Sequence, residues 1–273
     1  MTNPRSPGVL VLAGQRSGRL DPLAARAGVT HKCLVPVEGR SLIGRVLETV
    51  ERALPVSLLY LSIEDPAALD GEPTVARLKK LGRLTIVPAQ FNLVDSVRAA
   101  CDLASYPLVI TTADNALLSA DALRQIVDEG ASGSCDAILG MAAKRDIQAA
   151  HPGGKGRYYE FRDGGYSNCN LFWLGGPRAL DAAEAFRQGG QFLKVAGRMM
   201  KAFGVVNLLL YRLKVRSLRQ AFRSISRRLG VRVKPLVFGD GRLAIDVDDE
   251  RSKQMVEELL RAGPVLAAEP VTD

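Results

Sequence analysis

The sequence has few of the residues that metal clusters and disulfide frameworks need. It contains two histidines and four cysteines, and no CxxC or Cys/His spacing joins them. Structural zinc sites and disulfide scaffolds both depend on such spacings, so both classes are disfavoured. We therefore expect reduced, buried thiols and a cytoplasmic location. The cysteines are Cys33, Cys101, Cys135 and Cys169.

A long hydrophobic run is also missing. The nearest candidate, Val205 to Leu210, is far shorter than the roughly 18 apolar residues that a membrane-spanning helix needs. The N-terminal residues Met1 to Pro7 are polar and have no apolar segment of the signal-peptide type. We expect neither a transmembrane helix nor a signal peptide.

Acidic residues are absent between Glu184 and Asp240, whereas lysine and arginine are frequent there. The whole chain has a formal net charge of +8 and a pI near 9.5. This charge requires an anionic partner, and nucleic acid, a membrane surface and a phosphorylated small molecule all qualify. The cations of this basic region are Arg187, Lys194, Arg198, Lys201, Arg212, Lys214, Arg216, Arg219, Arg223, Arg227, Arg228, Arg232 and Lys234.

Apolar runs of strand length alternate with helical patterns through the first half of the chain. This alternation predicts an α/β fold with a mainly parallel, Rossmann-like central sheet, helices on both faces and ligands at the carboxyl ends of the strands. A helical basic insertion is expected near the C-terminal third. The expected strands are Val9–Leu12, Val56–Ile63, Leu84–Val87, Leu108–Thr111 and Ala137–Met141, and the expected helices are Ser41–Leu54, Thr74–Leu81, Leu93–Ala104 and Ala120–Glu129.

The first expected strand ends in a loop of small residues that begins at Ala13 and Gly14. Backbone N–H groups can close around an anion where no Cβ obstructs them, so such a loop suits a phosphate. Arg19 and Lys32 would add positive charge. The glycines fit neither GxGxxG nor GxxxxGK[ST], so an ordinary strand-to-loop turn is an equal alternative on spacing alone.

The same stretch resembles the opening signature of the nucleotidyltransferases with a glycosyltransferase-A-like fold, which include sugar-phosphate and molybdenum-cofactor nucleotidyltransferases and the cytidylyltransferases. The family pattern is L-A-G-G-x-G-T-R-L, then P-K, then a G-K-P-L-I segment that opens a helix. The chain departs from it at Gln15 and Ser17, which replace glycines, and at His31, which replaces the proline. The matching residues are Leu12, Ala13, Gly14, Arg19, Leu20, Lys32, Gly39, Leu42 and Ile43.

The resemblance implies that this loop binds a nucleoside triphosphate and that Arg19 and Lys32 are catalytic cations. It also implies that the helix beginning near Leu93 faces the nucleotide. Capping of that helix by Asn92 or Asp95 is an equally simple explanation of the local sequence. The implied nucleotide-binding residues are Leu12, Ala13, Gly14, Gln15, Arg16, Ser17, Gly18 and Ser96.

Carboxylates follow two apolar segments. Asp114 follows Leu108–Thr111, and Asp246 and Asp248 follow Leu243–Ile245. Alternation along an extended strand places Asp246 and Asp248 on one side, and Mg²⁺ prefers such oxygen ligands. An Asp turn or a helix cap is the alternative at each place.

Both acidic segments resemble metal motifs of the same family. Residues 113–118 resemble D-x-P-L-L without its proline, and residues 246–250 resemble the start of D-x-D-T-P-E-D-L, with the expected helix following at Ser252 to Ala262. The resemblance implies Mg²⁺ as the cofactor and Asp114, Asp246 and Asp248 as its ligands.

The segment between the two acidic sites is expected to bind the acceptor of the transferred nucleotide and to determine its specificity. A basic loop with Lys155 and Arg157 enters a strand, and a return strand carries Asn170, the best counterpart of a family asparagine that touches the acceptor. A surface hairpin with solvated charges is the alternative. The helical stretch Phe192 to Leu229 fits a lid, with Lys194 projecting into the acceptor pocket, or a contact with an anionic membrane.

Together these residues predict a Mg²⁺-dependent nucleotidyltransferase that moves a nucleoside monophosphate from a nucleoside triphosphate to a sugar phosphate or lipid-headgroup phosphate. Transfer of CMP from CTP is favoured, and GTP is a possible donor. The alternatives are a sugar-nucleotide-dependent glycosyltransferase and a non-catalytic module that binds membrane or nucleic acid, although nucleic acid is not the expected partner. We expect a single domain, with a nucleotide half (1–142), an acceptor half (143–240) that includes a helical lid (191–229), and a closing metal-binding strand and helix (241–273).

Overall fold

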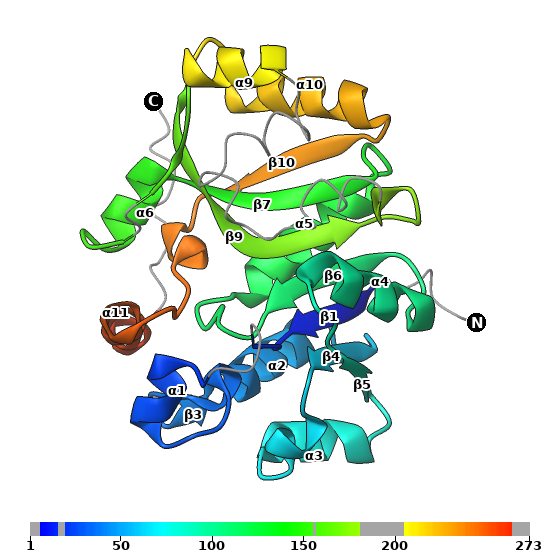
Figure 1. Ribbon diagram of the computed structural model, residues 1–273, viewed down its shortest axis with the longest axis vertical. Coiled ribbons are helices and arrows are strands. Elements are labelled where there is room, and N and C mark those ends of the chain that lie inside the picture. Colours follow the sequence, from blue (N-terminus) through cyan, green and yellow to red (C-terminus); the bar gives the residue numbers. More distant parts are fainter. Residues whose placement is uncertain (1–5, 16–19, 155–156, 181–204, 264–273) are drawn as a thin grey trace, which may run out of the picture.

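A sheet of eight described strands forms the centre of the protein (Figure 1). The computed structural model describes residues 6–15, 20–154, 157–180 and 205–263. The strand order is β10-β7-β9-β6-β1-β4-β5, with β8 pairing on β9, and β2 and β3 form a separate ribbon. The strands are β1 (Gly8–Leu12), β2 (Pro36–Val37), β3 (Arg40–Ser41), β4 (Leu59–Ile63), β5 (Leu84–Pro88), β6 (Leu108–Thr112), β7 (Ala137–Ala143), β8 (Tyr159–Phe161), β9 (Gly164–Leu174) and β10 (Val233–Phe238).

The sheet is mixed and mostly parallel. Strand β1 pairs in parallel with β4 and β6, β4 with β5, and β7 with β10. Strand β9 is inserted antiparallel between β6 and β7. The carboxyl ends of β1, β4, β5 and β6 therefore meet at one edge, as expected for an α/β protein. The predicted fold class is confirmed.

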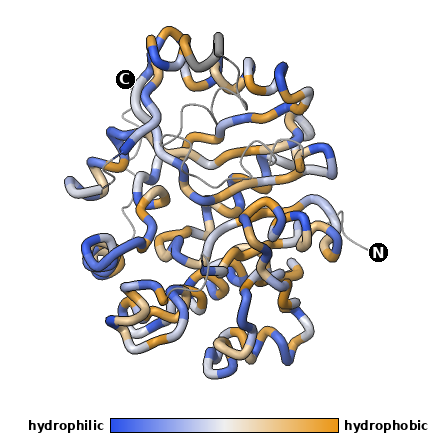
Figure 2. Tube along the Cα trace, viewed as in Figure 1, coloured by the Kyte–Doolittle hydropathy of each residue, from blue (hydrophilic) through white to orange (hydrophobic). Residues whose placement is uncertain are grey.

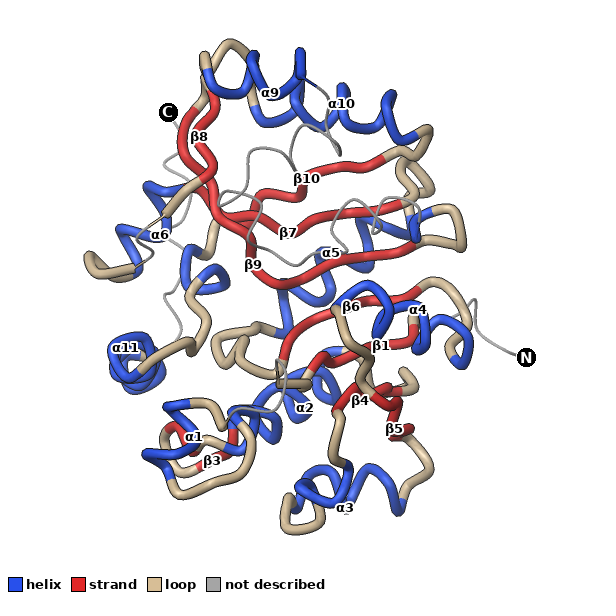
Figure 3. Tube along the Cα trace, viewed as in Figure 1, coloured by secondary structure: helices blue, strands red, loops and turns tan. Residues whose placement is uncertain are grey.

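Helices cover both faces of this sheet (Figures 1 and 3), because successive residues of a strand point to opposite sides. Val9 and Val11 of β1 belong to one buried cluster, and Leu10 and Leu12 belong to another. The first cluster includes residues of α1 (Pro22–Ala27), α2 (Leu42–Ala53), α3 (Pro73–Lys80), α5 (Ala120–Ala131), α6 (Lys144–Ala150) and α11 (Glu250–Ala262), and the second includes residues of α4 (Leu93–Leu103) and α10 (Leu218–Leu229).

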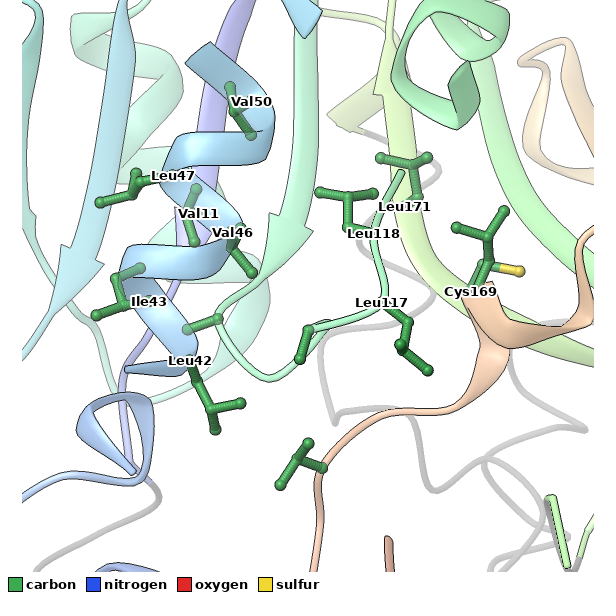
Figure 4. Packing of buried hydrophobic residues seen from close by; sticks show 14 of the residues in the cluster. Val11, Leu42, Ile43, Val46, Leu47, Val50, Leu117, Leu118, Cys169 and Leu171 are labelled. Carbon is green, nitrogen blue, oxygen red and sulfur yellow. The ribbon is translucent and has the colours of Figure 1, made fainter. Parts of the chain in front are cut away.

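Helix α2 shows how the sequence pattern produces this packing (Figure 4). Its apolar residues recur every three or four positions, so they form one stripe that faces β1. Ser41 caps the helix by accepting the Gly44 N–H at 3.0 Å. Burial of each such aliphatic side chain stabilises the fold by roughly 1.5–3 kcal/mol. Figure 2 shows hydrophobic residues along the central strands and a hydrophilic α11 at the periphery. The stripe residues in Figure 4 are Leu42, Ile43, Val46, Leu47 and Val50.

Two segments differ from the prediction. The strand expected from Val56 begins at Leu59, and Val56 and Leu58 are 72% and 53% exposed. The closing segment is not a strand: Gly241–Ala244 is a 3₁₀ turn, and residues 245–249 form a loop without ladder pairing. An apolar run predicts burial there, but Asp240 caps the turn through the Arg242 N–H, and this favours a turn over a strand.

The described part of the predicted lid consists of α9 (Val205–Arg212) and α10. Its remainder, residues 191–204, lies outside the described residues. None of the described helices is long and apolar enough to cross a bilayer.

Candidate active site

Three carboxylates converge at the carboxyl edge of the sheet. Asp114 follows β6, whereas Asp246 and Asp248 precede α11, and one oxygen from each lies within 4.8 Å of the others. The Val247 N–H donates to the Asp114 carbonyl oxygen at 3.1 Å, which joins the two segments. Hard oxygen ligands at this spacing fit a magnesium ion. We call these residues the carboxylate cluster.

Lys32 inserts its ammonium group into this cluster. Its Nζ lies 2.7 Å from Asp114 Oδ2 and 2.9 Å from Asp248 Oδ1. Burial by itself lowers the pKa of Lys32, but the charges and hydrogen bonds of the two carboxylates outweigh burial and raise this pKa above its ordinary value. Lys32 is therefore a fixed cation beside the carboxylate cluster at neutral pH.

Asp114 is held in place by neighbours that sequence reasoning did not identify. The Thr112 hydroxyl donates to Asp114 Oδ1 at 2.6 Å. Asn115, which is 1% exposed, donates through Nδ2 to the Cys169 carbonyl oxygen at 2.9 Å. These contacts fix the exit of β6 against β9. In the sequence, the one visible feature is an asparagine directly after the aspartate.

The helix-cap alternative applies to Asp249 and not to Asp248. Asp249 accepts the Ser252 N–H at 2.8 Å and forms a capping box with Ser252 at the start of α11. The Ser252 backbone N–H, followed by its hydroxyl, lowers the pKa of Asp249. The Ser252 hydroxyl also accepts the backbone N–H of Asp248 at 2.8 Å. The acidic run is thus divided between capping and the carboxylate cluster.

Asn170, the predicted acceptor-binding residue, lies beside the carboxylate cluster. Its Nδ2 donates to Asp246 Oδ2 at 3.2 Å, and its own N–H donates to Asn168 Oδ1 at 2.9 Å. Its φ of 49° is a left-handed conformation, which asparagine tolerates better than most residues. A register shift between β7 and β9 near Met141 accompanies this conformation.

The first loop carries its own carboxylate partner. The Gln15 N–H lies 3.1 Å from both oxygens of Glu64, at the end of β4, and His31 Nε2 lies 3.4 Å from Glu64 Oε1. A Cβ on Gly14 would lie 3.2 Å from Glu64 Oε2 and 3.0 Å from the Cβ of Ala89, so a larger residue there would be tightly packed against both neighbours. Glu64 had not been predicted, since its role depends on strand order.

The remaining residues of this loop divide into two groups. Leu12 and Ala13 are buried at the end of β1, where their backbone continues the sheet. The predicted residues Arg16, Ser17, Gly18 and Arg19 lie outside the described residues.

Ser96 is buried and forms hydrogen bonds within the protein. It is 5% exposed, accepts the Gln90 N–H at 2.8 Å and donates to the Asn92 carbonyl oxygen at 3.2 Å. Asn92 caps α4 by accepting the Asp95 N–H at 3.0 Å, so the capping alternative is correct for Asn92. Ser96 fixes the loop after β5 at the edge where ligands are expected.

The other predicted acceptor residues are not joined to the cluster by any described contact. Arg157 is exposed just before β8 and makes no hydrogen bond or ion pair within the described part of the chain. Lys155 and Lys194 lie outside the described residues.

Comparisons with solved structures agree with this architecture. A hypothetical transferase from Thermus thermophilus has a TM-score of 0.73 at 24% identity, covering 91% of this chain and 100% of that one. A CMP:2-keto-3-deoxy-manno-octonic acid synthetase complexed with CTP has a TM-score of 0.56 at 12% identity, covering 94% and 99%. A 4-diphosphocytidyl-2C-methyl-D-erythritol synthase has a TM-score of 0.54 at 13% identity, covering 95% and 100%. At these identities the likeness shows a shared fold.

No curated protein matches the sequence. The family comparison is more specific, because residues 9–233 match the MobA-like NTP transferase domain. This range contains Lys32, Asp114 and Asn170, and it favours nucleotidyl transfer over the glycosyltransferase alternative. The chain belongs to the MobA-like NTP transferase domain family, whose members are nucleotidyltransferases.

Proposed function

We propose that the protein transfers a nucleoside monophosphate, preferably CMP, from a nucleoside triphosphate to a small phosphorylated acceptor, with release of pyrophosphate. The observation that carries this proposal is the position of Lys32 Nζ between Asp114 and Asp248, which form the carboxylate cluster with Asp246. Such a group of carboxylates and a cation suits phosphoryl chemistry, in which positioning and charge neutralisation provide most of the catalysis.

In the proposed reaction, an oxygen of the acceptor phosphate attacks the α-phosphorus. A new phosphorus–oxygen bond forms, the bond to the β-phosphate breaks, and pyrophosphate leaves with the electron pair. No general base is required, because a phosphate monoester is largely dianionic near pH 7. Lys32, and Arg19 by resemblance, would neutralise negative charge on the reacting and departing phosphates.

Asp114, Asp246 and Asp248 would hold the magnesium ion. When bound, the ion supplies Lewis-acid stabilisation of phosphate oxygens. The contacts of Asp114 with Thr112 and of Asp246 with Asn170 orient these carboxylates before any ligand arrives. These carboxylates would position the magnesium ion and the phosphates, since the protein contributes little covalent chemistry.

Base selection is proposed to involve Glu64. Its carboxylate accepts hydrogen bonds at the edge of the nucleotide loop and donates none. Cytosine presents an amino group at the position where uracil and thymine present a carbonyl oxygen, so a carboxylate favours CTP over UTP. Guanine also presents donors. The replacement of two family glycines by Gln15 and Ser17 argues for CTP over GTP.

The proposed acceptor is a strongly anionic phosphomonoester, such as a sugar phosphate or a lipid-headgroup phosphate. Asn170 would donate to it beside the cluster, and Lys155, Arg157 and Lys194 would provide charge. This assignment is supported by the basic composition of the acceptor half.

Pyrophosphate release tests the proposal directly. Each of the four nucleoside triphosphates would be incubated with a panel of small phosphomonoesters, with Mg²⁺ or EDTA. We expect release that requires one acceptor class, Mg²⁺ and Asp114, with CTP as the best donor. Transfer from a UDP-sugar without any pyrophosphate would instead identify a glycosyltransferase.

A further inference from the structure

Helix α10 carries a row of arginines on its outer surface. Leu218 and Phe222 are buried against the sheet, at 2% and 8% exposure. Arg219, Arg223 and Arg227 are all exposed, and their spacing of four residues places them along one side of the helix. The helix is thus apolar toward the protein and cationic toward solvent.

This positive charge is not neutralised by the described part of the protein. No hydrogen bond or ion pair joins any of the three arginines to another described residue, and the sequence has no acidic residue between Glu184 and Asp240. The neighbouring cation Lys214 differs, because its Nζ lies 3.6 Å from Glu160 Oε2.

Large aliphatic side chains are exposed on the segment that precedes α10. Leu209, Leu213 and Val215 are 54%, 62% and 48% exposed at the end of α9 and in the connection to α10. Leu209 and Leu213 are one turn apart, and the two helices contact each other. Figure 1 shows α9 and α10 together at one end of the long axis, with α1 and α3 at the other end. We call these six residues the α9–α10 face.

We propose that the α9–α10 face docks the protein on an anionic lipid bilayer. Arginines would pair with the headgroups, and the aliphatic side chains would enter the boundary between headgroups and acyl chains. Mixed cationic and aliphatic exposure suits a bilayer better than a nucleic acid, because unpaired bases are bound by stacking on aromatic rings. The nearby Tyr211 ring is engaged with Phe161, with a centroid distance of 5.5 Å.

This inference does not depend on the proposed reaction. The docking surface contains none of the proposed catalytic, nucleotide or acceptor residues. Binding of this kind is peripheral, in agreement with the absence of a bilayer-crossing helix among the described residues.

Vesicle co-sedimentation with the full chain tests the proposal. Vesicles of phosphatidylcholine alone would be compared with vesicles containing phosphatidylglycerol, at low and high salt. The test variant is Arg219→Gln/Arg223→Gln/Arg227→Gln. The matched control changes three exposed cations on α1 and α3, Arg26→Gln/Lys79→Gln/Lys80→Gln, and so removes the same charge at the other end of the molecule.

We expect wild type to bind only the anionic vesicles and to be released by salt. The test variant should lose about 100-fold in partition coefficient, since each arginine near an anionic surface contributes roughly a factor of five. The control should lose only a few-fold. Leu209→Ser/Leu213→Ser should weaken binding to the anionic vesicles at low salt, because it removes the aliphatic contribution while all three arginines remain. Unchanged thermal melting would show that the variants are folded.

Three results would overturn the proposal: no binding of wild type to anionic vesicles, an equal loss in the test and control variants, or salt-sensitive binding to a single-stranded oligonucleotide with no binding to vesicles. Nucleotide turnover in solution reports separately on the proposed function, because the test variant leaves the carboxylate cluster intact.

Discussion

Lys32 Nζ lies 2.7 Å from Asp114 Oδ2, although 82 residues separate them in the sequence. The same ammonium group contacts Asp248, so it lies between two of the three carboxylates that would hold a magnesium ion. Its positive charge holds these carboxylates together, and it would compete with the charge of a bound metal ion. The role of Lys32 can therefore be tested by measuring Mg²⁺ affinity, independently of turnover.

Replacement of Lys32 by Met should strengthen Mg²⁺ binding in the absence of nucleotide, by about tenfold, because the ion no longer competes with an ammonium group. Turnover should fall at the same time. Isothermal titration with Mg²⁺ measures the affinity. Lys253→Met is the control, since Lys253 lies on α11 but pairs with Glu257. Weaker Mg²⁺ binding by Lys32→Met would show that the ammonium group does not compete with the metal ion.

Asp114→Ala should affect turnover, whereas Asp249→Ala should affect stability. Asp114→Ala should lower kcat by about 10² or more, because it removes charge from the reacting centre. Asp249→Ala should instead lower the free energy of unfolding by about 0.5–2 kcal/mol through loss of the α11 cap, with kcat nearly unchanged. Pyrophosphate release and urea unfolding measure the two quantities. Equal kcat losses in both variants would mean that the acidic residues act as one group.

Glu64→Gln should reduce the preference for CTP over UTP by about tenfold, because the new amide can donate to a uracil carbonyl as well as accept from cytosine. The measurement is the ratio of kcat/KM for the two triphosphates. Glu129→Gln, on α5, is a control for the loss of one negative charge. A ratio that Glu64→Gln leaves unchanged would remove Glu64 from base selection.

The contribution of Lys32 to stability should be constant below about pH 10. Its pKa is raised in the folded protein, so its stabilisation is fully present below the unfolded value of about 10.4 and is lost as the pH rises through the folded pKa. The difference in unfolding free energy between wild type and Lys32→Met should therefore be equal at pH 7 and pH 9. It should shrink only in more alkaline solution. A difference that shrinks between pH 7 and pH 9 would contradict the raised pKa.

Gly130→Ala should destabilise the protein even though alanine favours helices. The added Cβ would lie 2.6 Å from Trp173 Nε1 and closer still to the carbon atoms of the indole. Overpacking of this kind costs about 1–3 kcal/mol, more than the roughly 1 kcal/mol that alanine gains over glycine in a helix. Thermal or urea unfolding measures the change. Gly71→Ala is the control, because its Cβ would meet nothing within 4 Å.

The sequence by itself determined the alternation of strands and helices, the parallel sheet and the edge where ligands are expected. It also indicated Asp114, Asp246, Asp248 and Asn170. The fold and the three aspartates were indicated by hydrophobic periodicity and by residues that follow apolar runs, which are local properties, whereas Asn170 was implied by the resemblance to the family. The basic outer side and the apolar inner side of α10 follow from the same periodicity.

The tertiary structure alone decided which of these groups meet. Lys32 reaches Asp248 across 216 residues, and Glu64 meets Gln15 across 49, because the strand order places their segments at one edge of the sheet. It also decided that Asp249 caps a helix while its neighbour Asp248 joins the cluster, and that residues 245–249 form a loop. Local patterns fix the direction and burial of a segment, but contacts between distant segments depend on how the whole sheet is ordered.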